Sequence, residues 1–395
     1  MSAQATYTDY QRRKYLPELD GLRAISVLLV VSVHLHDFET TWKWLAGWQG
    51  VTVFFVLSGY LITTLSLREE GQRGALSLAA FYVRRSLRIF PLYYLTLLAY
   101  CVLIFALKIG PEKRFLLSGA MPYYLLYFQE IPFFYGLPGE SGAVQHANIP
   151  FYQSWSLGIE EKFYLVWPLL AFVLWRGRSV LRLRGTLLVV VAFALVPPLF
   201  AVAGCEKAAA VFFPYYPILA GCLVAILMHD RAWFDRLRFL GSRAWTVATL
   251  AIFVTLHLAR PQLPADSPTL AYLCDTAYAV AVSAFLVSVL MGEGRVQQAL
   301  RWGPLVSIGR LSYGIYLIHI LCLNVAQKVF QPHTGNVAVS VGAYLLTCAV
   351  SVGVAWCLAA VIEKPCIEIG RRWSKRILEE GNSRESLIHG ATVRG

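Results

Sequence analysis

Two ionisable residues lie in the first long apolar run of the chain, and their spacing suggests chemistry inside a membrane. Arg23 and His34 occur in a segment that is otherwise apolar from Leu22 to Val33. Eleven residues make about three turns of an α-helix, so both side chains share a face and lie roughly 16 Å apart along the axis. Ionisable groups in such runs are expensive and usually functional. Because an imidazole accepts a proton near neutral pH, His34 is a candidate general base.

A pair of basic residues forms the second candidate site. Arg85 and Arg88 open another apolar run, and a spacing of three puts them on one helix face. Two guanidinium groups side by side suit the bidentate binding of phosphate. Ordinary anchoring of a membrane helix by cytoplasmic arginines is the alternative interpretation.

A carboxylate near the start of a further apolar segment is the third candidate. Glu160 is followed by Glu161 and Lys162, and such charges require an interior or wet environment. Glu160 and His34 are expected at compatible depths, so we hypothesise that Glu160 orients the imidazole. Four further residues are candidates for substrate binding, although helix packing alone would also explain them: Ser58, Tyr60, Trp155 and His319.

Composition indicates that these residues are positioned by membrane helices. Of 395 residues, 57% are hydrophobic and only 15% are charged, and the mean hydropathy is +0.56, which predicts an all-α, polytopic membrane bundle. Lys and Arg gather in alternate loops, so the net charge of +12 indicates orientation in a lipid bilayer and not binding to nucleic acid. Ten spans are predicted, at 20–36, 48–67, 87–109, 150–174, 186–203, 208–228, 243–258, 270–291, 305–325 and 338–362.

The same charge pattern predicts the domain organisation. Residues 1–15 and 371–395 are expected to be cytoplasmic, the latter partly disordered, around a membrane domain at 16–370. Residues 110–149 are expected to form one outward segment whose aromatic residues lie at headgroup level or re-enter the membrane. The eight cysteines are scattered without metal-ligand spacing, so no metal site is predicted.

Seven short motifs, taken together and in order, resemble the membrane acyltransferase-3 family between about residues 16 and 368. They are Leu-Asp-Gly-Leu-Arg from Leu19, the Arg23–His34 spacing, Phe-Phe-Val-Leu-Ser-Gly-Tyr from Phe54, Tyr-x-Arg-Arg-x-x-Arg-Ile-x-Pro from Tyr82, Trp-Ser-Leu-x-x-Glu from Trp155, Ser-Tyr-x-x-Tyr-Leu-x-His from Ser312, and Glu-Lys-Pro from Glu363.

The resemblance implies an enzyme of the bacterial inner membrane that O-acylates cell-surface carbohydrate such as lipopolysaccharide or exopolysaccharide. It also implies a cytoplasmic acyl-CoA donor, with acetyl-CoA the commonest, no bound cofactor, and essential roles for Arg23, His34, Arg85 and Arg88. Whether His34 is a base or an acyl carrier stays open.

Two alternatives accompany this interpretation. Some members of the family carry a periplasmic esterase-like domain, for which the printed chain leaves no room, so we expect direct transfer or a separate partner protein. A transporter or flippase for a glycan also has many helices with buried ionisable residues, but no internal repeat is apparent here.

Overall fold

A computed structural model describes residues 6–35, 44–137, 149–263, 267–330 and 336–392, and it contains only helices within these ranges. The prediction of an all-α bundle is therefore confirmed. Eight of its helical segments are long and apolar enough to cross a membrane: Gln49–Arg73 (α3), Leu78–Ala106 (α4 and a π-helical end), Ser179–Val202 (α8), Ala208–His229 (mostly α10), Arg243–Gln262 (mostly α12), Pro268–Met291 (α13), Ser312–Phe330 (α16) and Val337–Glu380 (α17 into α18).

The other two predicted spans are helical but shorter or more polar. Helix α2, Pro17–Val33, has 17 residues. Helix α7, Trp155–Pro168, continues into the π-helix Leu169–Leu174, and its middle carries Glu160, Glu161 and Lys162. The ten-span topology with cytoplasmic termini stays a prediction, whereas several apolar helices establish a multi-pass membrane protein.

Two predicted boundaries are wrong. Helix α2 ends at Val33, so His34 is its C-cap and not an interior residue of a helix reaching residue 36. The predicted span 305–325 is divided, because α15 (Gly303–Arg310) ends before Leu311 and α16 (Ser312–Phe330) begins after it. The predicted tail at 371–395 belongs to α18, Lys364–Thr392, as far as the structure describes it.

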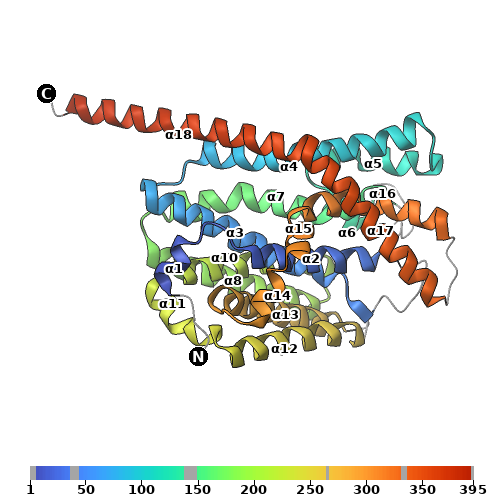
Figure 1. Cartoon of the computed structure of the whole chain (residues 1–395), viewed down its shortest axis with the longest axis horizontal. Helices are drawn as coiled ribbons and strands as arrows, with labels where there is room; N and C mark the ends of the chain where they lie inside the picture. Colours follow the sequence, from blue (N-terminus) through green and yellow to red (C-terminus); the bar gives the residue numbers. More distant parts are fainter. Residues whose placement is uncertain (1–5, 36–43, 138–148, 264–266, 331–335, 393–395) are drawn as a thin grey trace.

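Short helices connect the long ones. Within residues 110–149, for which an outward position stays a prediction and of which 138–148 lie outside the described residues, α5 and α6 are too short to cross a bilayer. Twelve residues of helix reach about 18 Å. In Figure 1, α1 and the far end of α18 lie at one end of the bundle, and α5 lies at the other. The short helices are α1 (Tyr7–Arg12), α5 (Arg114–Leu125), α6 (Glu130–Tyr135), α9 (Glu206–Phe212), α11 (Arg231–Leu237) and α14 (Arg295–Leu300).

Glycines let the central helices approach closely. A Cβ atom on Gly59 of α3 would lie 1.9 Å from the carbonyl oxygen of Ile218 in α10 (Tyr215–His229). Conversely, a Cβ on Gly221 of α10 would lie 2.0 Å from the carbonyl oxygen of Val56. Gly50 meets α2 in the same way, 2.5 Å from the carbonyl oxygen of Ser26. These three glycines therefore let α3 lie close to both α10 and α2.

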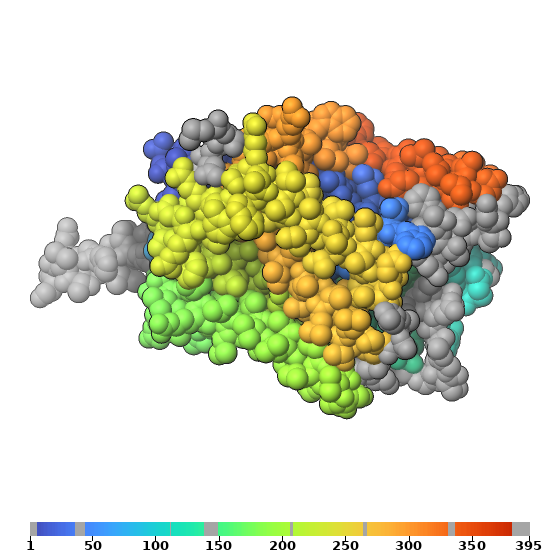
Figure 2. Space-filling model, turned by 90° about the horizontal axis from the view of Figure 1, so that it is seen from below, coloured from blue at the N-terminus to red at the C-terminus, as the bar shows by residue number. Residues whose placement is uncertain are grey.

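The lipid-facing surface is carried largely by α8 and α12 (Arg243–Ala259). Large apolar side chains on these helices are exposed, among them Leu188 at 71% and Val247 at 60%. Figure 2 shows green α8 and yellow α12 together on one face of the molecule. An apolar surface of this kind suits a bilayer, since lipid tails replace the protein partners that a soluble core would need.

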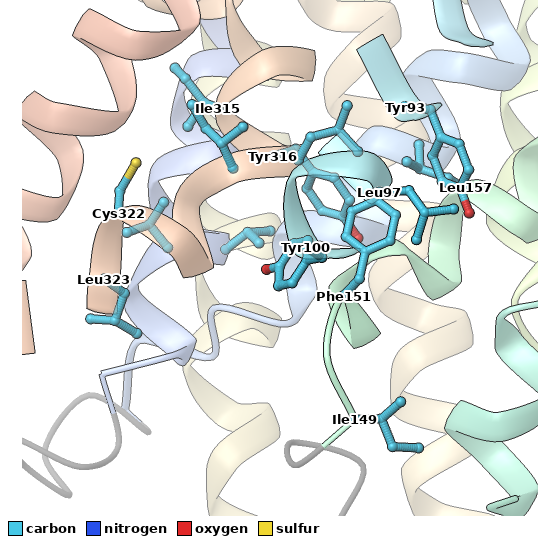
Figure 3. Close-up of a cluster of buried hydrophobic side chains, with 14 of the residues drawn as sticks. Tyr93, Leu97, Tyr100, Ile149, Phe151, Leu157, Ile315, Tyr316, Cys322 and Leu323 are labelled. Carbon is cyan, nitrogen blue, oxygen red and sulfur yellow. The ribbon is translucent and has the colours of Figure 1, made fainter. Parts of the chain in front are cut away.

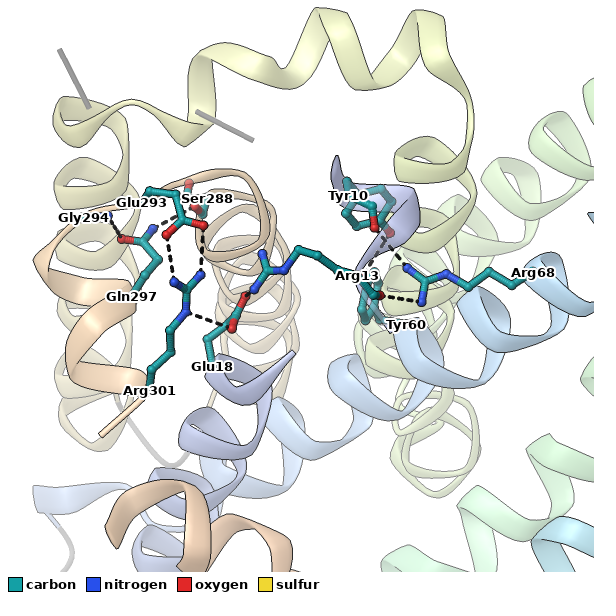
Figure 4. A network of polar contacts seen from close by, with 10 residues as sticks. All are labelled: Tyr10, Arg13, Glu18, Tyr60, Arg68, Ser288, Glu293, Gly294, Gln297 and Arg301. Carbon is teal, nitrogen blue, oxygen red and sulfur yellow. Dashed lines mark hydrogen bonds and ion pairs between the residues drawn. The ribbon is translucent and has the colours of Figure 1, made fainter. Parts of the chain in front are cut away.

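An ion-pair network lies at the end of the bundle that contains α1. Glu18 is fully buried and accepts hydrogen bonds from Arg13 at 2.5 Å and Arg301 at 3.2 Å. Arg301 also binds Glu293 at 2.8 Å, and this hydrogen bonding lowers the pKa of the Glu293 carboxyl. Figure 4 shows these groups beside the Tyr10–Tyr60 pair. The network ties the chain before α2 to α14 and its neighbours.

Candidate active site

A cavity of about 450 Å³ runs into the bundle from the end that contains α1. Its outer part is lined by the exposed residues Lys14, Tyr15 and Arg371, so this end reaches the surface. Its inner part is lined by Ser156 and Tyr316. Six basic and two acidic side chains line the cavity, so its walls favour an anion. They are Lys14, Arg23, Arg68, Arg85, Arg88 and Arg371, with Asp20 and Glu160.

Three of the arginines in the cavity make no hydrogen bond or ion pair with any residue that the structure describes. Arg23, Arg85 and Arg88 are half-buried, and within the described ranges none of their guanidinium groups makes a hydrogen bond or an ion pair. Arg85 lies over the ring of Tyr164, with its Cζ 5.2 Å from the ring centroid. This contact supports the side chain while leaving its N–H donors unused. Because partly buried charges need counter-charge, the three arginines form a site ready for an anionic ligand.

Two other arginines of the bundle are paired with carboxylates and have a structural role. Arg182 donates to both carboxylate oxygens of Glu70, at 2.7 and 2.8 Å. Arg84, next to Arg85 in sequence, binds Glu69 at 2.6 Å. Paired arginines of this kind hold helices together, so the absence of such pairing at Arg85 distinguishes the two neighbours.

Glu160 lies in the same cavity, within electrostatic range of Arg23 and Arg85. Its carboxylate accepts a hydrogen bond from the hydroxyl of Tyr164 at 3.3 Å. The Tyr164 hydroxyl is also hydrogen-bonded to Ser58. The cavity therefore brings together Arg23, Ser58, Arg85, Arg88 and Glu160 from four helices.

The hypothesis that Glu160 orients His34 is wrong. The Nδ1 atom of His34 lies 2.6 Å from the hydroxyl of Tyr152, and Glu160 is engaged by Tyr164 instead. Among the described residues, no hydrogen bond or ion pair joins His34 to Glu160. The 3-10 helix Tyr152–Ser154 comes directly before α7 in the chain and brings Tyr152 to His34 at the end of α2. Glu160 lies further along α7, in the cavity.

His34 lies against a second histidine. The rings of His34 and His319 have centroids 4.9 Å apart. His319 is fully buried, and its Nδ1 lies 2.7 Å from the carbonyl oxygen of Tyr316. The two histidines come from α16 and the end of α2, and neither lines the arginine cavity.

Tyr316 separates the histidines from the cavity. Its ring centroid lies 5.9 Å from that of His319 and 6.4 Å from that of Phe54, and Tyr316 and Phe54 both line the cavity whereas His319 does not. Its hydroxyl donates to the carbonyl oxygen of Gln153 at 2.5 Å and lies 2.6 Å from the hydroxyl oxygen of Ser156. Figure 3 shows Tyr316 in the buried cluster with Tyr100 and Phe151. The inner end of the cavity is thus closed by an anchored aromatic ring.

The two remaining predicted residues have clear structural partners. Tyr60 is fully buried, and its hydroxyl lies 2.9 Å from that of Tyr10, although it also contributes to the cavity wall. Trp155 is not among the cavity residues and stacks on Phe133 of the outward segment, with ring centroids 4.9 Å apart.

Sequence reasoning missed Tyr152, Tyr164 and Tyr316 as members of the site. Tyr316 lies inside the motif that begins at Ser312, and Tyr164 lies four residues after the motif that ends at Glu160. Their helical spacing from His319 and Glu160 was an available signal. Tyr152 had none, because a residue before a helix reveals nothing about a partner 118 positions away. In the described part of the chain, no three His, Cys, Asp or Glu side chains gather to hold a metal ion.

Comparison with known proteins defines the class. The family described as Acyltransferase domain matches residues 16–360, so the chain belongs to this acyltransferase family, as its motifs predicted. Among its relatives, peptidoglycan O-acetyltransferase OatA of Listeria monocytogenes is 28% identical over 82% of this chain and 52% of its own length. The putative peptidoglycan O-acetyltransferase YrhL of Bacillus subtilis is 28% identical over 94% of this chain and 58% of its own.

A shorter match involves a putative O-acetyltransferase of Staphylococcus aureus, 33% identical over 44% of this chain and 28% of the relative. The chain spans about half the length of the first two relatives. No solved structure matches the chain at a significant level.

Proposed function

We propose that the protein is a membrane O-acetyltransferase that moves an acetyl group from acetyl-CoA to a hydroxyl of a cell-envelope glycan. The observation that carries the proposal is the set of three unpaired arginines in a cavity that reaches the surface. Coenzyme A carries phosphates that bind guanidinium groups, and its long pantetheine arm fits a channel leading away from them. The names of the relatives support acetyl as the acyl group.

In this proposal the donor phosphates bind Arg85 and Arg88 at the cytoplasmic side of an inner membrane. Arg23, which lines the same cavity, adds positive charge beside the thioester end of the donor. Ser58 and Ser156 line the path of the pantetheine arm. The acetyl group then reaches Tyr316, whose ring must move aside before the group meets His34.

His34 performs the transfer, either as a base toward the acceptor or as a transient carrier of the acetyl group. The acceptor arrives from the outer side, where Tyr152 binds His34 and Trp155 stacks on Phe133. Peptidoglycan is the acceptor best supported by the relatives' names. The proposal also includes lipopolysaccharide and exopolysaccharide as alternative acceptors and a separate esterase-like protein as a partner.

Binding of acetyl-CoA to purified protein in nanodiscs tests the donor site. The double variant Arg85→Ala and Arg88→Ala should weaken binding about 100-fold or more, since each charge-assisted hydrogen bond contributes about 1.5–3 kcal/mol. Arg231→Ala is the matched control, because this exposed arginine lies outside the cavity. Unchanged affinity in the double variant would contradict the donor site. Movement of a glycan without any acetylation would support a transporter instead.

A further inference from the structure

One ring nitrogen of His319 makes a hydrogen bond, and the other makes none with the described residues. A carbonyl oxygen only accepts hydrogen bonds, so the Nδ1 atom of His319 donates its proton to the carbonyl oxygen of Tyr316, 2.7 Å away. In the neutral ring, the Nε2 atom therefore carries a lone pair. This atom is buried and has no hydrogen-bond partner among the residues that the structure describes, and the whole residue is 0% exposed.

An unpaired acceptor in the interior is costly unless something binds it. Leaving such a group unsatisfied destabilises the folded state, and native structures keep few of them. The unsatisfied nitrogen of His319 lies where the reaction is proposed to occur, because the ring of His319 contacts that of His34. His34 is the residue assigned to acyl transfer in the proposed function. A hydroxyl group held between the two rings would satisfy Nε2 and lie next to His34.

We propose that the two histidines divide the reaction. His319 is the catalytic base that takes the proton of the acceptor hydroxyl, and His34 is the transient carrier of the acetyl group. This inference rests on the proposed function and assigns the base, which that function left open between two roles of His34.

The acetyl group is transferred in two steps, first to His34 and then to the acceptor. A ring nitrogen of His34 attacks the thioester carbonyl, the N–C bond forms, and the C–S bond breaks as coenzyme A leaves as a thiolate. The acceptor hydroxyl then gives its proton to Nε2 of His319 while its oxygen attacks the acetyl carbon. The new O–C bond forms, the C–N bond breaks, and its electron pair returns to His34. The proton on His319 finally passes to the thiolate, so the products are an ester and free coenzyme A.

The structure explains why two imidazoles suit this reaction. Tyr316 separates the donor cavity from the histidines, and its backbone carbonyl fixes the tautomer of His319. Tyr152 binds Nδ1 of His34 from the outward side, which directs the ring of the carrier. His34 therefore receives the acetyl group from the side of the cavity. His319, whose ring contacts that of His34, receives the proton of the acceptor hydroxyl.

Radiolabelled acetyl-CoA, with chitotetraose as the acceptor probe, tests the division in the full-length protein in nanodiscs. His319→Asn keeps an amide N–H near the position of Nδ1, so the Tyr316 carbonyl retains a donor while the base is removed. We expect label on chitotetraose to fall about 100- to 10,000-fold, the usual contribution of a general base. Labelled protein that hydroxylamine releases should accumulate instead. His34→Asn should show neither labelled protein nor labelled sugar.

Two results would overturn the inference. One is transfer by His319→Asn at close to the wild-type rate. The other is loss of transfer without labelled protein, in a variant whose thermal unfolding is unchanged. A purely structural role would lower the unfolding temperature and weaken both steps, so it would not trap the label. Wild-type protein that leaves acetyl-CoA intact would contradict the proposed function itself, which separates the two failures.

Discussion

At the scale of single residues, the site depends on which polar groups the fold leaves without partners. Arg182 and Arg84 are neutralised by Glu70 and Glu69, whereas Arg85 has only the face of Tyr164. The spacing of Arg85 and Arg88 predicted a shared face, and both line the cavity. The partner of His34 could not be predicted, because Tyr152 follows Phe151, whose positive φ of 68° turns the chain before α7 begins.

A prediction at this scale concerns Tyr316, the ring that closes the cavity. Tyr316→Phe removes the hydrogen bonds to Gln153 and Ser156 and keeps the ring. Because each such bond contributes about 1 kcal/mol, the ring should swing aside more often. We expect hydrolysis of acetyl-CoA without acceptor to rise several-fold, as measured by thiol release. Tyr278→Phe, which breaks the hydrogen bond between Tyr278 and His257 outside the cavity, is the control. Equal hydrolysis in Tyr316→Phe and wild type would argue against a closing role.

At the scale of elements, hydrophobic runs and charged loops predicted where most helices lie. They did not predict the π-helical turns at Leu169–Leu174 and Ala359–Glu363, since these depend on packing and not on local composition. They also missed the break at Leu311, because an apolar residue there carries no signal for a turn. The close crossing of α3 and α10 could not be predicted either, because the sequence does not show that Gly59 and Gly221 face one another.

A prediction at this scale contrasts two glycines of α3. Gly59→Ala places a Cβ atom 1.9 Å from the carbonyl oxygen of Ile218, which must shift. Overpacking of this kind costs about 1–3 kcal/mol or more, so the unfolding temperature in detergent should fall. Gly71→Ala meets nothing within 4 Å and replaces a glycine in a helix, so it should be neutral or stabilising by about 0.5–1 kcal/mol. Equal stability of the two variants would contradict the close crossing.

At the scale of the whole molecule, the protein places two chemical environments at different depths of one bundle. A basic cavity opens at the end that contains α1, and a pair of histidines lies beyond Tyr316. The exposed apolar side chains of α8 and α12 seat the bundle in lipid. Charge asymmetry predicted the orientation of the chain in the membrane. The position of Tyr316 between the two environments could be recognised only from the structure.

The prediction at this scale is the orientation in the membrane. After replacement of the eight native cysteines, Glu112→Cys and Glu380→Cys report on the outward segment and on the C-terminal helix. An impermeant maleimide should label Glu112→Cys in intact cells, because residues 110–149 are expected to face outward. It should label Glu380→Cys only after the membrane is opened. The reverse pattern would contradict cytoplasmic placement of the arginine cavity.

The most direct test of the account is acetylation of the envelope glycan by cells that produce His34→Ala at the wild-type protein level. His229, at the end of α10 and outside the cavity, provides the control variant His229→Ala. The account predicts that O-acetyl groups, measured by mass spectrometry of the isolated glycan, disappear in His34→Ala and persist in His229→Ala. Glycan from His34→Ala that is acetylated as fully as the wild type would contradict it.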